Sequence, residues 1–457
     1  MTQRPTPRPG EARSEGRSVQ DVYASDRYPV PPLLRETASR FAGSDGLTTE
    51  AYTSLEFHDR EMERMWPRVW QMACREEDIP SVGDYEVYEI GDISLIVVRA
   101  EADQIRAYHN SCLHRGTKLC EGSGHLQRLR CPFHNFTWQL DGRLSHVPCQ
   151  WDFPHVEGES FRLPEAAVEC WGGFVFVNPD PAAGDLSTYL ENMPEHFTRW
   201  PLEERYKAAH VAKVIGCNWK IALEAFLEVF HLAGLHPDSL PVLGDANSQY
   251  DIWPDQRHVS RMISLSGVAS PHLEGFSEQR VLREASSYFG LDDLAETSIG
   301  NQPARGEIAE SMRRRLARDL GIDAAKVCDA EVMDVIEYFC FPNFITFGGF
   351  GSPLAYRSRP YGRDPHSCIF EVMFLLPLGS GMERPPAAPL RWLADNEPWA
   401  SVEEFSYFGR ILDQDFDMMP RVQAGLRASV KKTATLGNYQ EARIRHFRRV
   451  LDEYLGT

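Results

Sequence analysis

The chain has 457 residues, 42% of them hydrophobic, and a formal net charge of −18 at pH 7. This length favours two domains, because a single hydrophobic core seldom grows beyond about 300 residues. The negative charge argues against nucleic acids and anionic membranes as partners, since both would repel the protein surface. No run approaches the roughly 20 apolar residues of a membrane helix and no apolar signal segment opens the chain, so we expect a cytoplasmic protein with no membrane partner.

The residue pattern divides the chain into three regions. Residues 1–45 are rich in Pro, Arg, Ser and Gly, and we expect them to be disordered or extended because they offer little apolar surface to bury. Residues 46–185 hold short β-rich runs such as DYEVYEIGDISLIVVRA, broken by Gly, Asp and Pro, which predict an all-β domain. Residues 186–457 mix strands such as CIFEVMFLLPL with helical stretches near 217–233, 304–319 and 398–419, which predicts an α+β domain.

Two ligand pairs stand close together in the β-rich region. Cys112 and His114 form a CxH pair, and Cys131 and His134 form a CxxH pair further along. Two thiolates and two neutral imidazoles are the ligands of a Rieske [2Fe–2S] cluster, in which each iron takes one kind of ligand. A structural zinc site is the alternative, although zinc sites more often begin with CxxC pairs.

The surrounding residues strengthen the cluster interpretation. His109, Cys120 and His125 fall outside the two pairs, and we expect them to be structural. The stretches CLHRG and CPFHNFTWQLDGRLSHVP resemble the Rieske domain of ring-hydroxylating oxygenase α subunits. Asn135 and Phe136 depart from the usual Gly-Trp of that family, at a loop position beyond the last ligand.

A second motif, NWKIALEAFLEVFHLAGLHP, lies in the α+β region. Read as a helix capped by Asn218, it places Glu224, Glu228 and His231 on one face. A turn after the helix would let His236 swing back toward the same point. The motif resembles the mononuclear-iron segment of the same oxygenase family, and the resemblance implies that both histidines bind iron.

A carboxylate has to complete such a site, because the Fe(II) facial triad takes two histidines and one carboxylate and leaves positions open. Three aspartates near the C-terminus are candidates, Asp413, Asp415 and Asp417. The stretch FGRILDQDFDMMPRVQAGLRAS resembles the C-terminal helix of the family, in which the ligand precedes a glutamine by eight residues. Asp415 and Gln423 match that spacing, so Asp415 is preferred.

The resemblance also implies roles for two acidic residues and an assembly. Glu228 would bridge His134 of a neighbouring subunit to His231 and so carry the electron between subunits, as a catalytic residue. Glu224 would be a hydrogen-bond acceptor beside the iron ligands. The expected assembly is a head-to-tail homotrimer, with or without a β subunit.

The resemblance implies an oxidoreductase of α+β class, with an all-β Rieske domain followed by a catalytic domain in which helices flank an antiparallel sheet of helix-grip or START-like type. Its cofactors would be the [2Fe–2S] cluster and a mononuclear non-haem Fe(II). Electrons would come from a separate ferredoxin, flavin reductase or both, since the chain has no flavin or nicotinamide motif of its own.

The expected reaction uses O2 to hydroxylate or cis-dihydroxylate a hydrophobic substrate, aromatic or alicyclic. The stretch EYFCFPNFITFGGF, with Phe226 and Phe230, would line the pocket. Monooxygenation or demethylation of a non-aromatic substrate is the alternative reaction. Two other classes stay open at this point, an electron carrier with a degenerate second domain and a zinc-stabilised binding module.

Overall fold

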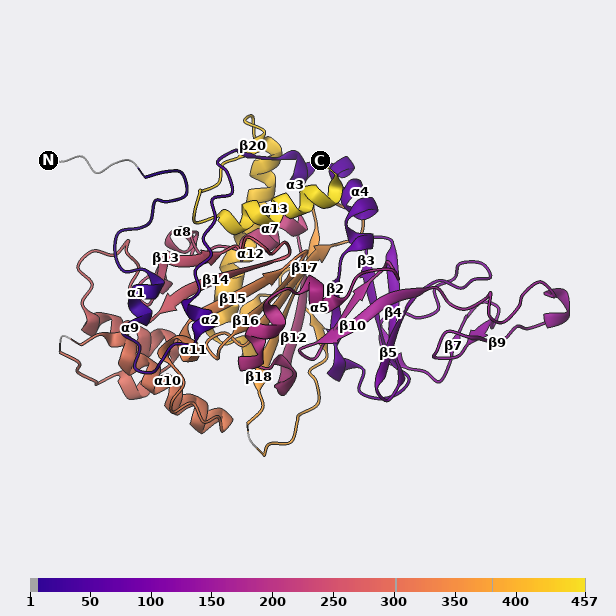
Figure 1. The fold of residues 1–457 in the computed structure, drawn as a ribbon, viewed down its shortest axis with the longest axis horizontal. Coiled ribbons are helices and arrows are strands. Elements are labelled where there is room, and N and C mark those ends of the chain that lie inside the picture. The colour runs from indigo at the N-terminus through magenta and orange to yellow at the C-terminus, as the bar shows by residue number, and fades with distance from the viewer. Residues whose placement is uncertain (1–6, 301, 380, 457) are drawn as a thin grey trace.

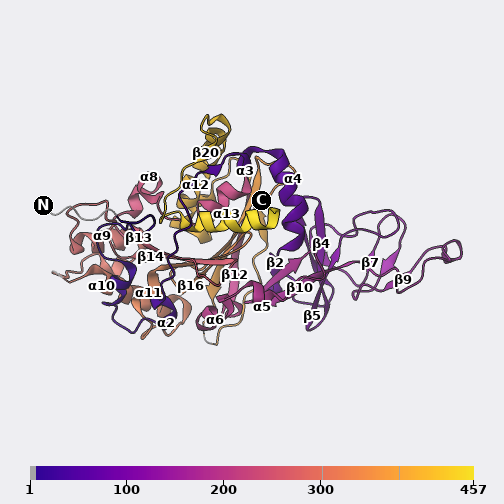
Figure 2. The ribbon, with the colours of Figure 1, turned by 45° about the horizontal axis from the view of Figure 1, so that its top comes forward.

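The structure is a computed structural model that describes residues 7–300, 302–379 and 381–456. The chain forms an elongated α+β molecule in which a β-rich part extends from one end of a larger part built on a long sheet (Figures 1 and 2). The predicted fold class is therefore confirmed. Among the described residues, no helix combines the length and apolar character needed to cross a membrane.

The β-rich part contains two small sheets. A seven-stranded antiparallel sheet has the order β2-β11-β10-β5-β4-β3-β6, and a three-stranded sheet has the order β7-β8-β9. A small hydrophobic core that includes Val98, Tyr108, Phe136 and Trp138 is buried in this part. The strands are β2 (Gln71–Arg75), β3 (Asp84–Ile90), β4 (Ile93–Glu101), β5 (Gln104–His109), β6 (Ser123–His125), β7 (Leu129–Arg130), β8 (Thr137–Trp138), β9 (Leu144–His146), β10 (Glu165–Trp171) and β11 (Phe174–Asn178).

An eight-stranded sheet organises the larger part, in the order β13-β14-β15-β16-β17-β18-β12-β19. Seven strands are antiparallel, and the short edge strand β19 joins in parallel to β12. A separate pair, β1 (Leu47–Thr48) and β20 (Thr433–Ala434), links two distant segments. The strands of the large sheet are β12 (Arg205–Ile215), β13 (Leu243–Asp251), β14 (Val259–Ser266), β15 (Val335–Cys340), β16 (Phe344–Gly348), β17 (Leu354–Pro360), β18 (Cys368–Pro377) and β19 (Leu390–Trp392).

Helices cover this sheet. The helices α7, α12 and α13 lie across the sheet in Figure 1. The helices α9, α10 and α11 lie near the edge formed by β13 and β14 (Figure 1). The helices are α1 (Val19–Tyr23), α2 (Pro32–Arg35), α3 (Glu50–Thr53), α4 (Leu55–Arg64), α5 (Leu186–Tyr189), α6 (Met193–His196), α7 (Trp219–Glu224), α8 (Leu232–Leu235), α9 (Glu278–Phe289), α10 (Ala304–Leu320), α11 (Asp329–Met333), α12 (Tyr407–Ala428) and α13 (Ala442–Leu455).

Buried polar contacts fix the two parts to each other. Arg357 of β17 donates hydrogen bonds to two carbonyls of β2, those of Met72 at 2.5 Å and Ala73 at 2.8 Å. Lys220 at the start of α7 pairs with Glu61 of α4 at 2.6 Å, with both side chains fully buried. Buried charges are tolerated when they are paired in this way, and removing one partner would leave the other uncompensated. The predicted boundary between residues 185 and 186 falls just before α5 and stays a prediction.

The prediction of a disordered or extended N-terminus is wrong for part of residues 1–45. Within the described residues, α1 begins after a capping box at Ser18 and buries Val19, Val22 and Tyr23, near β13 and β14. Leu34 of α2 is also buried. The composition of this segment is polar, but a helix concentrates its few apolar side chains on one face, and the sheet supplies the surface that covers them. Residues 1–6 lie outside the described residues.

The prediction of a single helix near residues 217–233 is also wrong beyond residue 224. Asn218 caps α7 as predicted, since its side chain accepts a hydrogen bond from the N–H of Lys220, but α7 ends at Glu224. The chain then runs irregularly to α8, so Glu224 and Glu228 do not share a helical face. Instead, Glu224 accepts a hydrogen bond of 2.9 Å from the Tyr52 hydroxyl, and among the described residues no hydrogen bond joins it to His231 or His236.

Replacing Tyr23 tests the docking of the N-terminal segment. The Tyr23→Ala substitution empties a site in which the ring is 1% exposed, so we expect the free energy of unfolding to fall by about 3 kcal/mol. Urea denaturation of the full chain measures the change. Glu15→Ala, in an exposed part of the same segment, should leave stability unchanged; equal stability of the two variants would mean that the segment does not dock.

Candidate metal centres

The four predicted cluster ligands lie on two loops of similar construction. In the first loop, the N–H of Gly116 donates to the carbonyl of Cys112 at 2.8 Å, and the N–H of Cys112 donates to Thr117. In the second, the N–H of Asn135 donates to the carbonyl of Cys131 at 3.0 Å, and the N–H of Cys131 donates to Phe136. Each loop therefore closes on its own cysteine. Both cysteines are buried.

The two histidines of these loops face each other. The ring centroids of His114 and His134 lie 4.7 Å apart, and the Nδ1 atoms of both rings are buried without a hydrogen-bond partner among the described residues. Buried polar atoms are nearly always paired, so two unpaired imidazole nitrogens beside two cysteines fit the ligands of a metal centre. Two thiols and two imidazoles fit a Rieske cluster.

The environment of Cys131 favours its thiolate. Burial acts to raise the pKa of Cys131, but backbone N–H groups of His134 and Phe133 point at the sulfur, and the net shift of its pKa is downward. N–H groups that stabilise a thiolate also suit sulfur bound to iron, because hydrogen bonds to cluster sulfurs help to set the reduction potential.

The departures from Gly-Trp are accommodated in the second loop. Asn135 has a φ of 62°, in the left-handed region that glycine usually fills and that asparagine tolerates better than most residues. Phe136 stacks on His114 at 4.7 Å with an interplanar angle of 12°, so an aromatic ring still covers a predicted ligand.

The three neighbouring residues that we expected to be structural do not join the two loops. Cys120 is buried in the small core, where Asn110 holds its backbone. His125 pairs with Asp84 at 2.9 Å. His109 ends β5 and donates its N–H to the carbonyl of Pro164.

A second group of ligands comes together on the large sheet. His231 and His236 flank the short helix α8, and Asp415 lies in the middle of α12. The Oδ1 atom of Asp415 lies 2.9 Å from Nε2 of His236 and 3.6 Å from Nε2 of His231. In the part of the chain that the structure describes, this is the one group of three or more such side chains whose ligand atoms, all within 4.8 Å of one another, could hold a single ion.

Hydrogen bonds orient both imidazoles toward this point. Nδ1 of the His231 ring donates to Oε1 of Glu228 at 2.7 Å. The backbone N–H of His231 donates to Oε2 of Glu228 at 3.0 Å. Nδ1 of His236 donates to Oε1 of Gln414 at 2.8 Å. Protons on both Nδ1 atoms leave the Nε2 lone pairs for a metal, which is the usual arrangement of metal-binding histidines. Sequence reasoning did not find Gln414, whose one signal is its place beside Asp415.

The charge of Glu228 also acts on His231. Burial lowers the pKa of His231, but the hydrogen bond and the negative charge of Glu228 outweigh this effect, and the net shift of its pKa is upward. A more basic imidazole is a better electron-pair donor to a metal. Glu228 therefore supports His231 both by orientation and by charge.

The three candidate aspartates have different surroundings. Asp413 accepts hydrogen bonds from the N–H groups of Trp399 at 2.7 Å and Ala400 at 3.1 Å, so its carboxylate is occupied by backbone. Asp417 is exposed. Asp415 is buried and faces the two histidines, which favours it as the ligand. Gln423, eight residues later, accepts a hydrogen bond of 2.7 Å from the N–H of Asn218 and so ties α12 to the start of α7.

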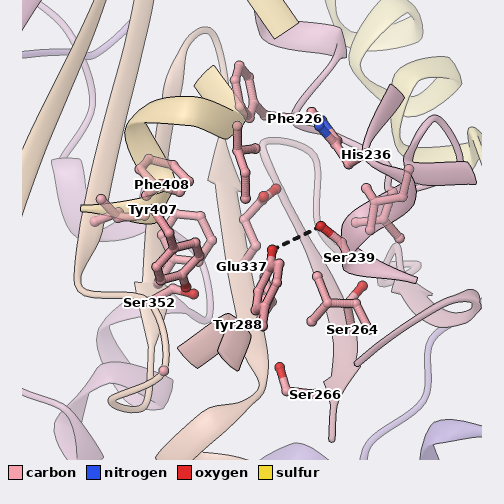
Figure 3. A pocket seen from close by; sticks show the side chains of 18 of the residues that line it. Phe226, His236, Ser239, Ser264, Ser266, Tyr288, Glu337, Ser352, Tyr407 and Phe408 are labelled. Atoms are coloured by element: carbon pink, nitrogen blue, oxygen red, sulfur yellow. Dashed lines mark hydrogen bonds between the residues drawn. The ribbon is translucent and has the colours of Figure 1, made fainter. Parts of the chain in front are cut away.

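The three ligands border a cavity of about 620 Å³. The large sheet forms its floor with residues at every second position, and Figure 3 shows Ser264, Ser266 and Glu337 among them. Phe226 lines the cavity as predicted, but Phe230 is 52% exposed and does not, so that prediction is wrong. From residues 337–350, Glu337 and Phe347 line it, since alternate strand residues face opposite sides.

Two family models match the chain. The Rieske [2Fe-2S] domain matches residues 69–157, and the ring hydroxylating alpha subunit (catalytic domain) matches residues 191–457. The second match covers more than half of the chain, so the chain belongs to the ring-hydroxylating oxygenase alpha subunits, as the motifs indicated. Its cofactors are accordingly a Rieske [2Fe–2S] cluster and a mononuclear non-haem iron, and the zinc-stabilised module is set aside.

Particular relatives include enzymes of different substrates. The chain is 30% identical over 263 residues to the glycine betaine monooxygenase oxygenase subunit of Chromohalobacter salexigens, an overlap of 56% of each chain. A structure of a quaternary ammonium Rieske monooxygenase has 16% identity and a TM-score of 0.62, over 90% of this chain and 95% of that chain. A mutant naphthalene 1,2-dioxygenase bound to phenanthrene has 18% identity and a TM-score of 0.63, over 92% and 94%. The chain spans about half the length of the curated relatives it matches.

Substitutions on α12 distinguish the proposed iron ligand, Asp415, from Asp413, which binds backbone N–H groups. The Asp415→Asn variant should lose the mononuclear iron and keep the two cluster irons, falling from about three irons per chain to about two. Asp413→Ala should keep all the iron but lose about 1 kcal/mol of stability, because it removes acceptors for two N–H groups. Iron analysis and urea denaturation measure both effects. Iron loss in Asp413→Ala together with full iron in Asp415→Asn would reverse the assignment.

Proposed function

We propose that this chain is the terminal oxygenase of a Rieske monooxygenase system that acts on an alkylated organic cation. The observation that carries the proposal is the convergence of His231, His236 and Asp415 on a cavity large enough for a small organic molecule. Two histidines and one carboxylate leave coordination positions open for O2 beside the substrate. When bound, the cluster supplies electrons one at a time and the iron activates O2.

The side chains of the chain have defined tasks in this proposal. His231 and His236 present neutral Nε2 atoms, and Asp415 supplies one negative charge. Glu228 and Gln414 hold the Nδ1 protons and so keep both rings in one orientation. The aromatic rings around the cavity exclude water from the reacting end of the substrate.

The substrate is the point at which we depart from the sequence interpretation. A hydrophobic aromatic or alicyclic compound was expected, but relatives of this chain are named for glycine betaine and quaternary ammonium compounds. The cavity also contains the buried carboxylate of Glu337, and an apolar substrate would remove water from the carboxylate oxygen that Arg443 does not bind. Both features favour the alternative of monooxygenation of a non-aromatic substrate.

The proposed reaction balances with O2 and two electrons. One oxygen atom enters a C–H bond as a hydroxyl group, and the other leaves as water with two protons. Where the hydroxylated carbon is a methyl group bonded to nitrogen, the C–N bond of the hydroxymethyl product breaks. This releases formaldehyde and the demethylated amine. The electron donor is a separate ferredoxin, reductase or both, because the sequence has no flavin or nicotinamide motif.

The placement of the two metal sites supports assembly as a homotrimer. The predicted cluster loops lie in the part that holds β7 and β9, at the opposite end of the molecule from α8 and its histidines (Figures 1 and 2). Exposed apolar side chains occur at both ends, with Phe133 and Trp151 near the cluster and Phe230, Met418 and Val422 near the iron site. Burial of both patches in a head-to-tail contact would bring His134 of one subunit to Glu228 of the next.

An oxygenation assay tests the function. With the cluster and iron in place, an electron-donor protein, NADH and 18O2, the protein should hydroxylate or demethylate a trimethylammonium compound, with label in the product or in formaldehyde. Mass spectrometry measures the label. His236→Ala should abolish product while the Rieske absorption spectrum persists. Formation of cis-diols from aromatic hydrocarbons, with no product from cations, would return the substrate to the aromatic class.

Substitution of Glu228 tests electron transfer. Glu228→Gln can still accept the Nδ1 proton of His231, so iron content should stay complete. Loss of the bridging charge should slow single-turnover oxidation of the reduced cluster about 10- to 100-fold. Stopped-flow absorbance measures the rate, and Glu228→Asp should recover part of it. A Glu228→Gln rate equal to that of the wild-type protein would exclude the bridging role.

A further inference from the structure

The floor of the cavity contains one acidic residue on its central strands. Glu337 lies in the middle of β15, and its neighbours across the ladder are Met262 of β14 and Phe347 of β16, both of which line the cavity. Side chains of paired residues point to the same face of a sheet, so the carboxylate stands between two apolar side chains. Figure 3 shows it between Phe226 and Tyr288, directed into the cavity.

A fixed arginine holds this carboxylate. Oε1 of Glu337 accepts a hydrogen bond of 2.7 Å from Nη1 of Arg443. Arg443 is fully buried and is itself held by Ser260 Oγ at 3.0 Å and by the carbonyl of Leu227 at 3.3 Å. Among the described residues, this is the one hydrogen-bond donor to Glu337. The second carboxylate oxygen therefore stays available on the cavity side.

Packing alone does not account for this arrangement. A buried ion pair is often no more stable than well-packed apolar side chains of similar volume. Glu337 is 2% exposed, and the floor around it is otherwise built from apolar and hydroxyl side chains. A carboxylate at this place acts on whatever fills the cavity, because the low dielectric of the interior strengthens its field.

Aromatic rings complete the surroundings of the charge. The cavity is lined by the rings of Phe226, Tyr288, Phe347, Tyr356 and Phe408. The faces of such rings attract cations, and aromatic cages are a common means of binding quaternary ammonium groups. Methyl groups on nitrogen can contact the rings while the nearby carboxylate balances the charge, with no need for an N–H donor.

We propose that Glu337 is the specificity-determining anchor for the cationic head of the substrate, which is an alkylated ammonium group. This inference rests on the proposed oxygenase function and deepens it by assigning the group that selects the substrate. Two other carboxylates line the cavity away from the metal ligands, Glu404 and Asp245. Glu404 is exposed to solvent, and the buried Asp245 is already engaged. Its Oδ1 accepts a hydrogen bond of 2.6 Å from Ser270, and its Oδ2 lies 3.8 Å from His272.

A pair of probes with one shape and different charge tests the anchor. Choline carries a positively charged quaternary nitrogen, and 3,3-dimethylbutan-1-ol has a neutral carbon at the same position. Calorimetric titration of the anaerobic, oxidised holoenzyme should show choline binding at least about tenfold more tightly, because a carboxylate in a low dielectric attracts the charge. Glu337→Gln should bring the two affinities to within about twofold, and Glu337→Asp should retain most of the preference.

Two matched variants control for general effects. Asp245→Asn removes the other buried carboxylate in the lining that lies away from the metal ligands, and Glu331→Gln removes a buried carboxylate that pairs with Arg199 outside the cavity. Both should keep the preference for choline. Equal affinities in the wild-type protein, a preserved preference in Glu337→Gln, or its loss in Asp245→Asn instead would each overturn the assignment.

The pH dependence of the wild-type protein supplies a further test. Burial raises the pKa of Glu337 to about 7, so the carboxylate is mainly ionised at pH 8 and mainly protonated at pH 6. The charged groups that act on it are Arg443 and, at longer range, Glu228, and the neutral hydroxyl of Tyr356 lies nearby. The other buried or half-buried carboxyl and imidazole groups that line the same cavity are those of Asp245, His231, His236 and Asp415. The preference for choline should therefore grow from pH 6 to pH 8 in the wild-type protein and stay flat in Glu337→Gln. A flat wild-type profile would contradict the anchor.

The outcome is distinct from that of the oxygenation assay. If the charge preference depends on Glu337 but no oxygenated product forms, the proposed oxygenase function is contradicted and a cation-binding site remains. If a trimethylammonium compound is oxygenated but the protein shows no charge preference, only the role of Glu337 is contradicted.

Discussion

The larger part of the molecule depends on one constraint, which is that three candidate metal ligands from distant segments, His231, His236 and Asp415, must meet in a fixed orientation. His236 and Asp415 are 179 positions apart, yet their side chains lie 2.9 Å apart. Such a contact needs rigid support on both sides. Asp413 anchors α12 to the chain before it, and Gln423 anchors the same helix to the start of α7. Asp415 lies between these two attachments, so the helix cannot rotate without breaking one of them.

The histidines receive their support from local hydrogen bonds. The chain between α7 and α8 is irregular, and this frees Glu228 to turn back on His231 through both carboxylate oxygens. A continuous helix would have used its backbone N–H groups within the helix. The broken helix is therefore what allows one carboxylate to orient the ring of His231 through both of its oxygens.

The cavity joins the metal site to the sheet. Strand alternation directs every second side chain of β14 to β17 into it, so the composition of those positions sets the chemistry of the lining. Most of them are apolar, aromatic or hydroxyl side chains. Glu337 is the departure, and Arg443 of the C-terminal helix stabilises its charge from below the cavity surface. The last helix of the chain thus contributes to the site without lining the cavity.

Short-range patterns in the sequence were sufficient to predict the ligand types, the family and the fold class, because these depend on short spacings and on strand and helix periodicity. The Cys112–His114 and Cys131–His134 pairs lie on tight loops whose geometry is local, and the matches to known families cover both metal-binding regions. The Asp415 preference came from a family spacing, and the burial of Asp415 and the occupied carboxylate of Asp413 agree with it.

Features that depend on long-range contacts became evident only in the folded chain. The helix after Asn218 breaks where Tyr52 binds Glu224, and the polar N-terminal segment folds where the large sheet covers Val22 and Tyr23. The partnership of Glu337 with Arg443 joins residues 106 positions apart, and the stretch that contains Glu337 reads in sequence as an aromatic strand. Local propensity cannot report these contacts, because the energy that fixes them comes from surfaces that meet only in the folded chain.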